Sequence, residues 1–178
     1  MKLIITAISI LFTASLIGQC KGFELKKDEF KGIDEMRTLW IANSTKLKGN
    51  KLQYRIEKSG DTTLLMIKTV LARKISVPSS SEVFFVNENG DKMNFQIKEE
   101  TETTEVQTLY GKGQELRATF YVPDDLLKTW NTSFNRARLY YNEESLTFEF
   151  NHNKNLKLFH EALNCYKREY AKIKFSKG

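Results

Sequence analysis

The two cysteines carry the most evident chemistry in this chain, because two thiols can be oxidised to a disulfide. Cys20 and Cys165 are the only cysteines among the 178 residues. In an oxidising compartment this pair favours a disulfide between the N-terminal arm and the C-terminal segment. Closing so long a loop stabilises a fold by roughly 4–5 kcal/mol through chain entropy. The alternative is an unpaired Cys165 that packs as a small apolar side chain.

The other reactive side chains show no catalytic or metal-binding spacing. His152 and His160 are the only histidines, and no His-Glu-x-x-His, Cys-x-x-Cys or Gly-x-Ser-x-Gly motif occurs. Three pairs of neighbouring acids stand where turns or a helix start are expected, and solvation and capping explain acids there. These pairs are Glu99-Glu100, Asp124-Asp125 and Glu143-Glu144. We therefore expect no catalytic residue, no cofactor and no metal ion.

Aromatic side chains are the candidate binding groups. Trp40, Trp130, Tyr140 and Tyr141 could contribute to a platform for a sugar or a peptide. Tyr140 and Tyr141 are neighbours on an expected strand, so their side chains point to opposite faces and only one of them can join a platform. Packing in the core explains these aromatic residues equally well.

The N-terminal segment predicts export. Lys2 provides a positive start, and residues 3–18 then run without a charge up to the small and polar residues around Cys20. This is the layout of a secretory signal peptide. The run is shorter than the roughly 20 apolar residues that span a bilayer, and an uncleaved anchor is the alternative. We expect a signal peptide at 1–18, a single β-rich domain at 19–178, and a secreted, periplasmic or cell-envelope location.

Two stretches near the N-terminus resemble known bacterial patterns. Leu16-Ile17-Gly18-Gln19-Cys20 is similar to a lipoprotein signal in its apolar and small positions, with Gln19 where Gly, Ala or Ser is usual. Lipidation of Cys20 is therefore a further alternative to a disulfide. Asp28-Glu29-Phe30-Lys31-Gly32, followed by a strand and antiparallel hairpins, resembles the opening of uncharacterised secreted β-rich domains of bacteria. That resemblance implies a secreted β fold and transfers no functional residue.

The composition is that of a folded domain with a mild positive charge. Hydrophobic residues make up 40%, and 28 basic residues stand against 22 acidic ones, a net charge of +6. Five basic residues gather near the C-terminus: Lys167, Arg168, Lys172, Lys174 and Lys177. We expect no nucleic-acid binding, which needs a clustered basic face, and weak contact with an anionic membrane surface.

Periodicity predicts strands over most of the chain and a helix at its end. Residues 52–57 alternate between apolar and polar, and residues 63–71 read as a central apolar strand. Residues 36–42 predict a strand in which Thr38, Trp40 and Ala42 share one face, whereas residues 23–33 read as an arm. Hairpins are expected around three turns: Asn89-Gly90, Gly111-Lys112-Gly113 and residues 142–145.

Two helices complete the expected fold. Pro123 opens a short helix that ends near Trp130. From Asn155 the apolar spacing changes to about 3.6 residues, which indicates an amphipathic C-terminal helix. We predict a mainly β domain, an antiparallel β-sandwich or open barrel of about 8–9 strands with these two helices.

Export without a catalytic motif favours a non-catalytic binding or structural module of the cell envelope or extracellular space. Its partner would be a protein, a glycan or an envelope component, and its oligomeric state stays open. One alternative is a small secreted hydrolase whose acids and histidines meet only in space. Another is a secreted inhibitor or immunity-type protein, which a single exposed patch of aromatic and charged residues would favour.

Overall fold

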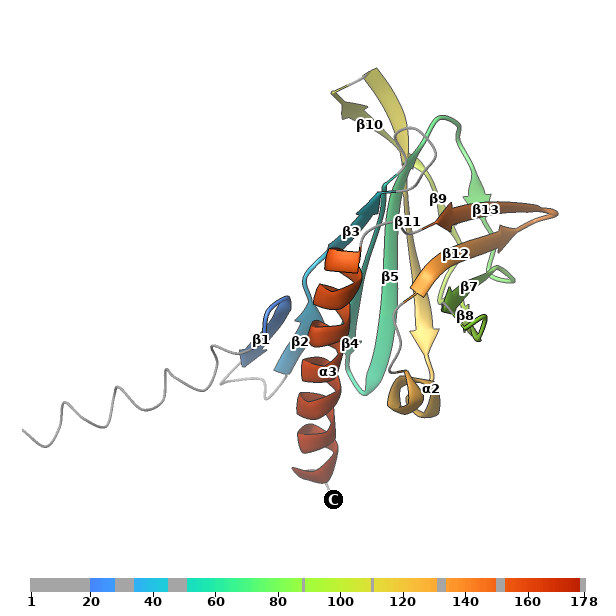
Figure 1. Ribbon diagram of the computed structural model, residues 1–178. Helices are drawn as coiled ribbons and strands as arrows, with labels where there is room; N and C mark the ends of the chain where they lie inside the picture. The colour runs from blue at the N-terminus through green and yellow to red at the C-terminus, as the bar shows by residue number, and fades with distance from the viewer. Residues whose placement is uncertain are drawn as a thin grey trace, which may run out of the picture.

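The computed structural model describes residues 20–27, 34–44, 51–87, 89–109, 111–130, 134–149 and 153–176. The expected signal peptide at 1–18, the stretch 28–32 and His152 lie outside these ranges. The described part of the chain is mainly β, with thirteen strands in antiparallel sheets and two helices, so the predicted fold class is confirmed (Figure 1). There are more strands than the expected 8–9 because the chain pairs in several pieces of only two to five residues.

The largest sheet has seven strands in the order β1-β2-β4-β5-β11-β10, and β3 also pairs with β4. Its strands are β1 (Phe23–Lys27), β2 (Asp34–Thr38), β3 (Ile41–Ser44), β4 (Lys51–Ser59), β5 (Thr62–Leu71), β10 (Thr104–Thr108) and β11 (Gly111–Val122). β5 is central, between β4 and β11, as its apolar sequence predicts. Residues 23–27, expected as an arm, form an edge strand instead, because β2 offers them a backbone to pair with.

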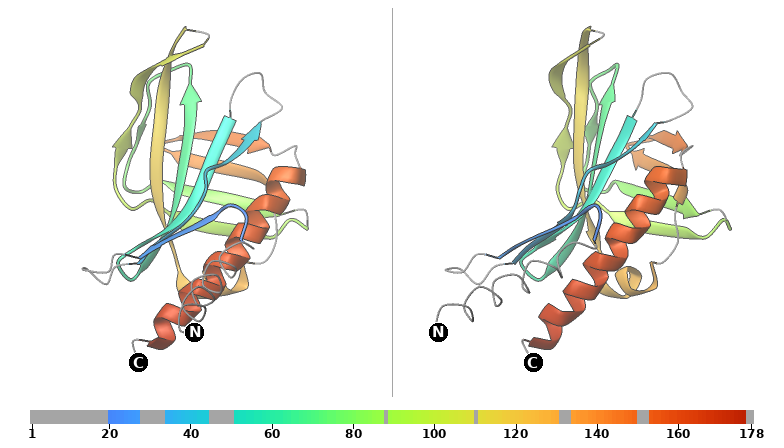
Figure 2. Two further views of the ribbon diagram at one scale, coloured as in Figure 1. Left: turned by 90° about the vertical axis from the view of Figure 1, so that its left-hand side faces the viewer. Right: turned by 60° about the vertical axis from the view of Figure 1, so that its left-hand side comes forward.

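A second sheet has the order β13-β12-β7-β8. Its strands are β7 (Glu82–Asn87), β8 (Lys92–Gln96), β12 (Phe134–Tyr141) and β13 (Glu144–Glu149), and a short pair joins β6 (Ser76–Val77) to β9 (Thr101–Glu102). The helices are α2 (Asp124–Thr129) and α3 (Asn153–Ser176). The strands of this four-stranded sheet run across those of the large sheet, and α3 lies diagonally beside the large sheet (Figure 2).

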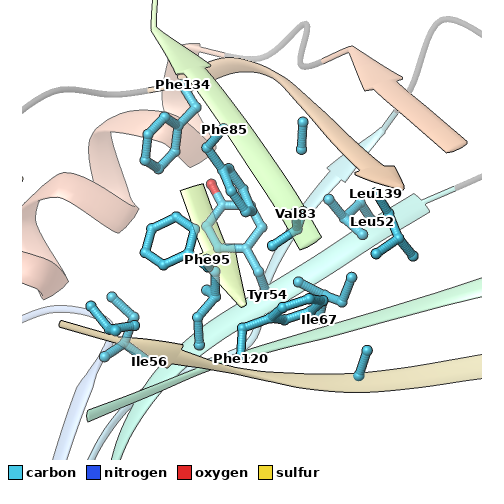
Figure 3. Packing of buried hydrophobic residues seen from close by; sticks show 14 of the residues in the cluster. Leu52, Tyr54, Ile56, Ile67, Val83, Phe85, Phe95, Phe120, Phe134 and Leu139 are labelled. Carbon is cyan, nitrogen blue, oxygen red and sulfur yellow. The ribbon is translucent and has the colours of Figure 1, made fainter. Parts of the chain in front are cut away.

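The core lies between one face of the large sheet and two covers, the four-stranded sheet and α3. The ring of Tyr54 on β4 lies 6.1 Å from Phe85 on β7 and 4.7 Å from Phe159 on α3, measured between centroids. Both covers therefore pack on the same face. Figure 3 shows the Tyr54 side chain of the large sheet directed toward Phe85 of the smaller one. Burial of these large apolar side chains is the main stabilising contribution.

A bulge changes the expected alternation at residues 36–42. β2 and β3 pair with the same strand, β4, in registers that differ by one residue. The extra residue falls at Leu39–Trp40, between the two strands. Thr38 and Ile41 are therefore both buried, while Leu39 is exposed. The predicted alternation of Thr38 and Trp40 against Leu39 and Ile41 is wrong, because a period of two assumes an unbroken strand. The side chain of Ala42 lies outside the described part.

Gly113 is a strand residue rather than part of a turn. It pairs with Val106, and the last paired residues of this hairpin are Thr108 and Gly111, so the predicted turn at 111–113 is wrong. A Cβ at Gly113 would stand 2.7 Å from Cγ1 of Val70. Glycine suits this position because the neighbouring strand lies so close. Sequence alone does not distinguish such a glycine from one in a turn.

The other local predictions are confirmed. β7 and β8 form the hairpin expected around Asn89-Gly90, where Gly90 has a φ of 88°. β12 and β13 pair up to Tyr141 and Glu144, so their turn is shorter than residues 142–145. Pro123 precedes α2, and α3 begins two residues before the expected start. These elements depend on signals within a few residues of each other, which is why the sequence is sufficient.

Tyr166 of α3 gives the fold a dependence on alkaline pH. The side chain is buried, and its hydroxyl shares a hydrogen bond of 3.1 Å with Thr63 Oγ1 of β5. Burial raises the pKa of the Tyr166 phenol above its ordinary value, and the hydrogen bond to Thr63 opposes that rise only in part. Because the folded pKa exceeds the unfolded one, the phenol's contribution is complete below about pH 10 and is lost at higher pH.

We therefore expect Tyr166→Phe to make stability less sensitive to pH above about 10. At neutral pH the same change should cost about 0.5–1.5 kcal/mol, the value of one buried hydrogen bond. Urea unfolding at pH 7 and at alkaline pH measures both effects. Tyr121→Phe, at an exposed position, is the matched control. An equal alkaline loss in Tyr166→Phe and in the wild type would contradict the assignment.

Candidate functional site

Strand alternation decides which side chains of the four-stranded sheet face away from the core. Val83 and Phe85 on β7, and Ala137 and Leu139 on β12, are buried, so their neighbours point outward. The outward side chains form a groove of about 600 Å³ lined by Glu82, Phe84 and Val86 of β7, Lys92 of β8, and Arg136, Arg138 and Tyr140 of β12. That volume lies within the roughly 300–1,000 Å³ typical of ligand sites.

The strand register arranges the groove residues in rows across the sheet. Val86 pairs with Lys92 on one side and with Arg136 on the other, so these two cations flank an apolar side chain. In the next row Phe84 pairs with Arg138. The groove therefore places positive charges beside apolar surface along its length.

The guanidinium of Arg138 is held in place by its neighbours. Its Nε donates a hydrogen bond of 2.9 Å to Thr147 Oγ1, and one terminal nitrogen donates a hydrogen bond of 3.2 Å to the Tyr140 hydroxyl. The ring of Tyr140 also meets Phe84 edge to face, with centroids 5.5 Å apart. An oriented guanidinium loses less side-chain entropy when it binds a ligand, which favours recognition of an anionic group.

Within the described part of the chain, the cations of the groove do not form the ion pairs seen on the large sheet. Among the described residues, neither Lys92 nor Arg136 forms an ion pair. On the outer face of the large sheet, by contrast, Lys68 lies 3.0 Å from Glu115, and Arg55 pairs in the same way with an acid. The groove, with three cations and one acid among its lining residues, therefore carries an excess of positive charge.

Of the four candidate aromatic residues, only Tyr140 lies in the groove. Its exposed fraction is 42%, and Tyr141 beside it is buried, as neighbouring positions on a strand require. Trp130 is also buried, so the structure removes both Trp130 and Tyr141 from any surface platform. Trp40 is partly exposed, but it lies under Arg55 on the large sheet, 4.6 Å from guanidinium carbon to ring centroid. Sequence position alone could not show that distant elements bury Trp130 and Tyr141.

Cys20 and Cys165 form the predicted disulfide, with their Cα atoms 6.0 Å apart. The bond ties the chain just before β1 to the middle of α3. Gly22 packs closely there, since a Cβ at this position would stand 3.3 Å from Leu158 Cδ1. A sulfur in a disulfide cannot also carry a thioether-linked lipid, so the two alternatives for Cys20 are mutually exclusive.

The acids and histidines weighed as catalytic candidates do not meet in the described part of the chain. The acid pairs occupy separate places: the segment after β8, the first turn of α2 and the turn before β13. His160 is half-buried on α3, and His152 lies outside the described residues. Among the residues that can be described, no three His, Cys, Asp or Glu side chains gather as metal ligands would.

A polar cluster of titratable groups forms around Tyr141. The Tyr141 hydroxyl donates to Glu144 Oε2 at 3.0 Å and accepts from Arg73 at 3.0 Å, while Arg73 also pairs with Glu144. Hydrogen bonds from Tyr141 and Arg73 lower the pKa of the Glu144 carboxyl, and burial raises that of the Tyr141 phenol. Both groups are thus held in one protonation state near neutral pH, which suits a structural tie better than proton transfer.

The basic residues near the C-terminus are partly engaged within the protein. The Lys167 Nζ donates to the backbone oxygens of Lys128 and Trp130, and Arg168 and Lys172 both lie beside Glu169. The side chains of Lys174 and Lys177 lie outside the described part. In the described chain, neither helix combines the length and apolar character that crossing a bilayer requires.

Comparison with known proteins found no matching family model, no matching curated sequence and no matching solved structure. The case for function therefore depends on the geometry of this chain.

Sequence reasoning missed Phe84, Lys92, Arg136 and Arg138. The signal for them was present in the predicted hairpins, because Arg136, Arg138 and Tyr140 stand two residues apart on one strand and must share a face. What the sequence did not contain was the pairing of β12 with β7, which adds Phe84 to the same face.

Proposed function

We propose that this chain is an exported, non-catalytic binding module that holds its ligand in the groove of the four-stranded sheet. The observation that carries the proposal is an open groove with two aromatic rings and three cations that form no ion pair with a described residue, whereas the acids and His160 are dispersed elsewhere. The groove offers contact surface and charge without a pair of acid and base groups. Such a set of side chains supports binding rather than turnover.

Two further observations support export. A disulfide between Cys20 and Cys165 suits an oxidising compartment, because cytosolic thiols are kept reduced. The uncharged segment 3–18 has the layout of a secretory signal peptide. Intact mass of the purified protein, before and after alkylation, tests this part by reporting cleavage after Gly18, lipid on Cys20 and the state of both thiols.

Affinity capture from a cell-envelope extract tests the binding role. We expect the immobilised domain to enrich a specific envelope component, and Tyr140→Ala to lose it. Tyr121→Ala is the matched control, because Tyr121 is 44% exposed and Tyr140 42%, on different sheets. Recovery of background material alone would contradict a binding module. Equal retention by the Tyr140 and Tyr121 variants would place the binding site outside the groove.

A secreted inhibitor or immunity-type protein is the second candidate. The same observation favours it, because aromatic and cationic side chains share one exposed patch. We rank it lower because a stable protein interface engages about 20–30 residues on each side, many more than line this groove. Capture of a secreted enzyme, together with inhibition of that enzyme by the domain, would reverse the order.

A further inference from the structure

We propose, on the basis of the function proposed above, that the ligand is a segment of an acidic polysaccharide of the polyuronate type. The carboxylates of such a polymer would pair with Arg136, Arg138 and Lys92. Its sugar rings would pack against Phe84 and Tyr140. The argument has three steps: the sign of the charge, its spacing, and the way the ligand is contacted.

The sign of the charge favours an anion. Lys92 and Arg136 form no ion pair with a described residue, and Arg138 makes its described contacts with hydroxyl oxygens and the Tyr140 ring rather than with carboxylates. Glu82 is the only acid in the lining and forms no described ion pair with any of the three cations. Charged hydrogen bonds from guanidinium to carboxylate are the strong ones, so carboxylates of a ligand would suit these cations.

The spacing of the charges favours a polymer over a single small anion. Arg136 and Arg138 are two residues apart on β12, which separates their backbones by about 6.5–7 Å. Lys92 lies in the row of Arg136 but two strands away, roughly 9.5–10 Å across the sheet. Cations so distributed can each pair with a separate anionic group of one ligand. Anionic groups repeated along a chain can meet them one after another.

The position of the groove on interior strands and its aromatic side chains favour sugars over an extended peptide. β7 and β12 are both interior strands, so their backbone N–H and C=O groups are already paired within the sheet. A peptide that recognises a sheet through its backbone needs an edge strand. The groove offers instead the rings of Phe84 and Tyr140, arranged edge to face, against which the C–H faces of sugar rings can pack.

Titration calorimetry of the intact, disulfide-bonded protein tests the inference with three probes. These are a galacturonate hexamer, the same hexamer with its carboxylates methyl-esterified, and a glutamate peptide of equal charge. We expect binding of the free acid, at least tenfold weaker binding of the ester and the peptide, and a decline in affinity with added salt. The double variant Arg136→Gln/Arg138→Gln should bind the free acid at least tenfold more weakly.

A matched variant controls for net charge. Lys128→Gln/Lys157→Gln removes the same charge from exposed positions on α2 and α3 and should bind like the wild type. Thermal unfolding establishes that each variant is folded. Equal loss in both double variants would mean that overall charge, rather than the groove, carries the binding, and would overturn the inference.

The remaining outcomes separate the ligand class from the binding role. Equal binding of the ester would overturn an acidic ligand while leaving a sugar-binding groove, and equal binding of the peptide would overturn the glycan. If no probe binds but capture from extracts still depends on Tyr140, the polyuronate is wrong and the binding module stands. If neither probe nor extract shows a partner that depends on Tyr140, both proposals fail.

Discussion

Replacing Cys20 and Cys165 together with serine is expected to lower the free energy of unfolding by roughly 4–5 kcal/mol. The bond closes a loop with a sequence separation of 145 residues, so its loss frees a large part of the unfolded chain. A total stability of about 5–15 kcal/mol is usual for a domain, and this single cross-link could supply a large share of it. Urea unfolding of the oxidised wild type and of the double variant measures the difference.

The packing around the disulfide should preserve part of the stability of the fold when the disulfide is absent. Phe23 on β1 meets the ring of Tyr166 on α3 edge to face, with centroids 6.4 Å apart, and β1 stays paired with β2. The double variant should therefore fold, with a lower midpoint. In reductant, the unfolding midpoint of the wild type should match that of the double variant. Equal midpoints for oxidised wild type and double variant, or two freely alkylated thiols in the exported protein, would contradict a stabilising disulfide.

Trp130→Ala is expected to destabilise the protein by about 3–5 kcal/mol, the usual cost of emptying a buried aromatic site. Trp130 lies at the end of α2 and contacts rings from three other elements. The centroid distances are 5.4 Å to Phe95 on β8, 4.9 Å to Phe134 on β12 and 5.5 Å to Phe159 on α3. Its removal leaves a cavity where the four-stranded sheet meets α3.

Two comparisons make this prediction specific. Trp130→Phe should cost much less than Trp130→Ala, because the ring contacts largely remain and the buried indole N–H, which has no described hydrogen-bond partner, is removed. Trp40→Ala should cost only about 0.5–1 kcal/mol, since Trp40 mainly contributes a partly exposed contact with Arg55. Chemical unfolding of the three variants gives the order of their stability losses. A Trp40 effect as large as that of Trp130→Ala would contradict the assignment of Trp130 to the centre of the core.

Much of the architecture could be predicted because its signals are local. The hairpin around Gly90, the helix after Pro123 and the 3.6-residue spacing of α3 each depend on residues within one or two turns of each other. Where a distant strand altered the local pattern, the prediction failed. The bulge at Leu39–Trp40 arises from pairing with β4, and Gly113 pairs with β10 close to Val70 of β5; local periodicity reports neither.

The sequence by itself determined a mainly β domain with a C-terminal helix, a pair of thiols able to cross-link, and a choice of one outward residue between Tyr140 and Tyr141. Only the tertiary structure decided that Tyr141 and Trp130 are buried, that Cys20 reaches Cys165, and that Phe84 joins the face of β12. The physical reason is that side-chain alternation follows from the backbone of one strand, whereas the choice of buried face depends on what packs against it. The large sheet packs against the face of the four-stranded sheet that carries Phe85, so the groove forms on the opposite face.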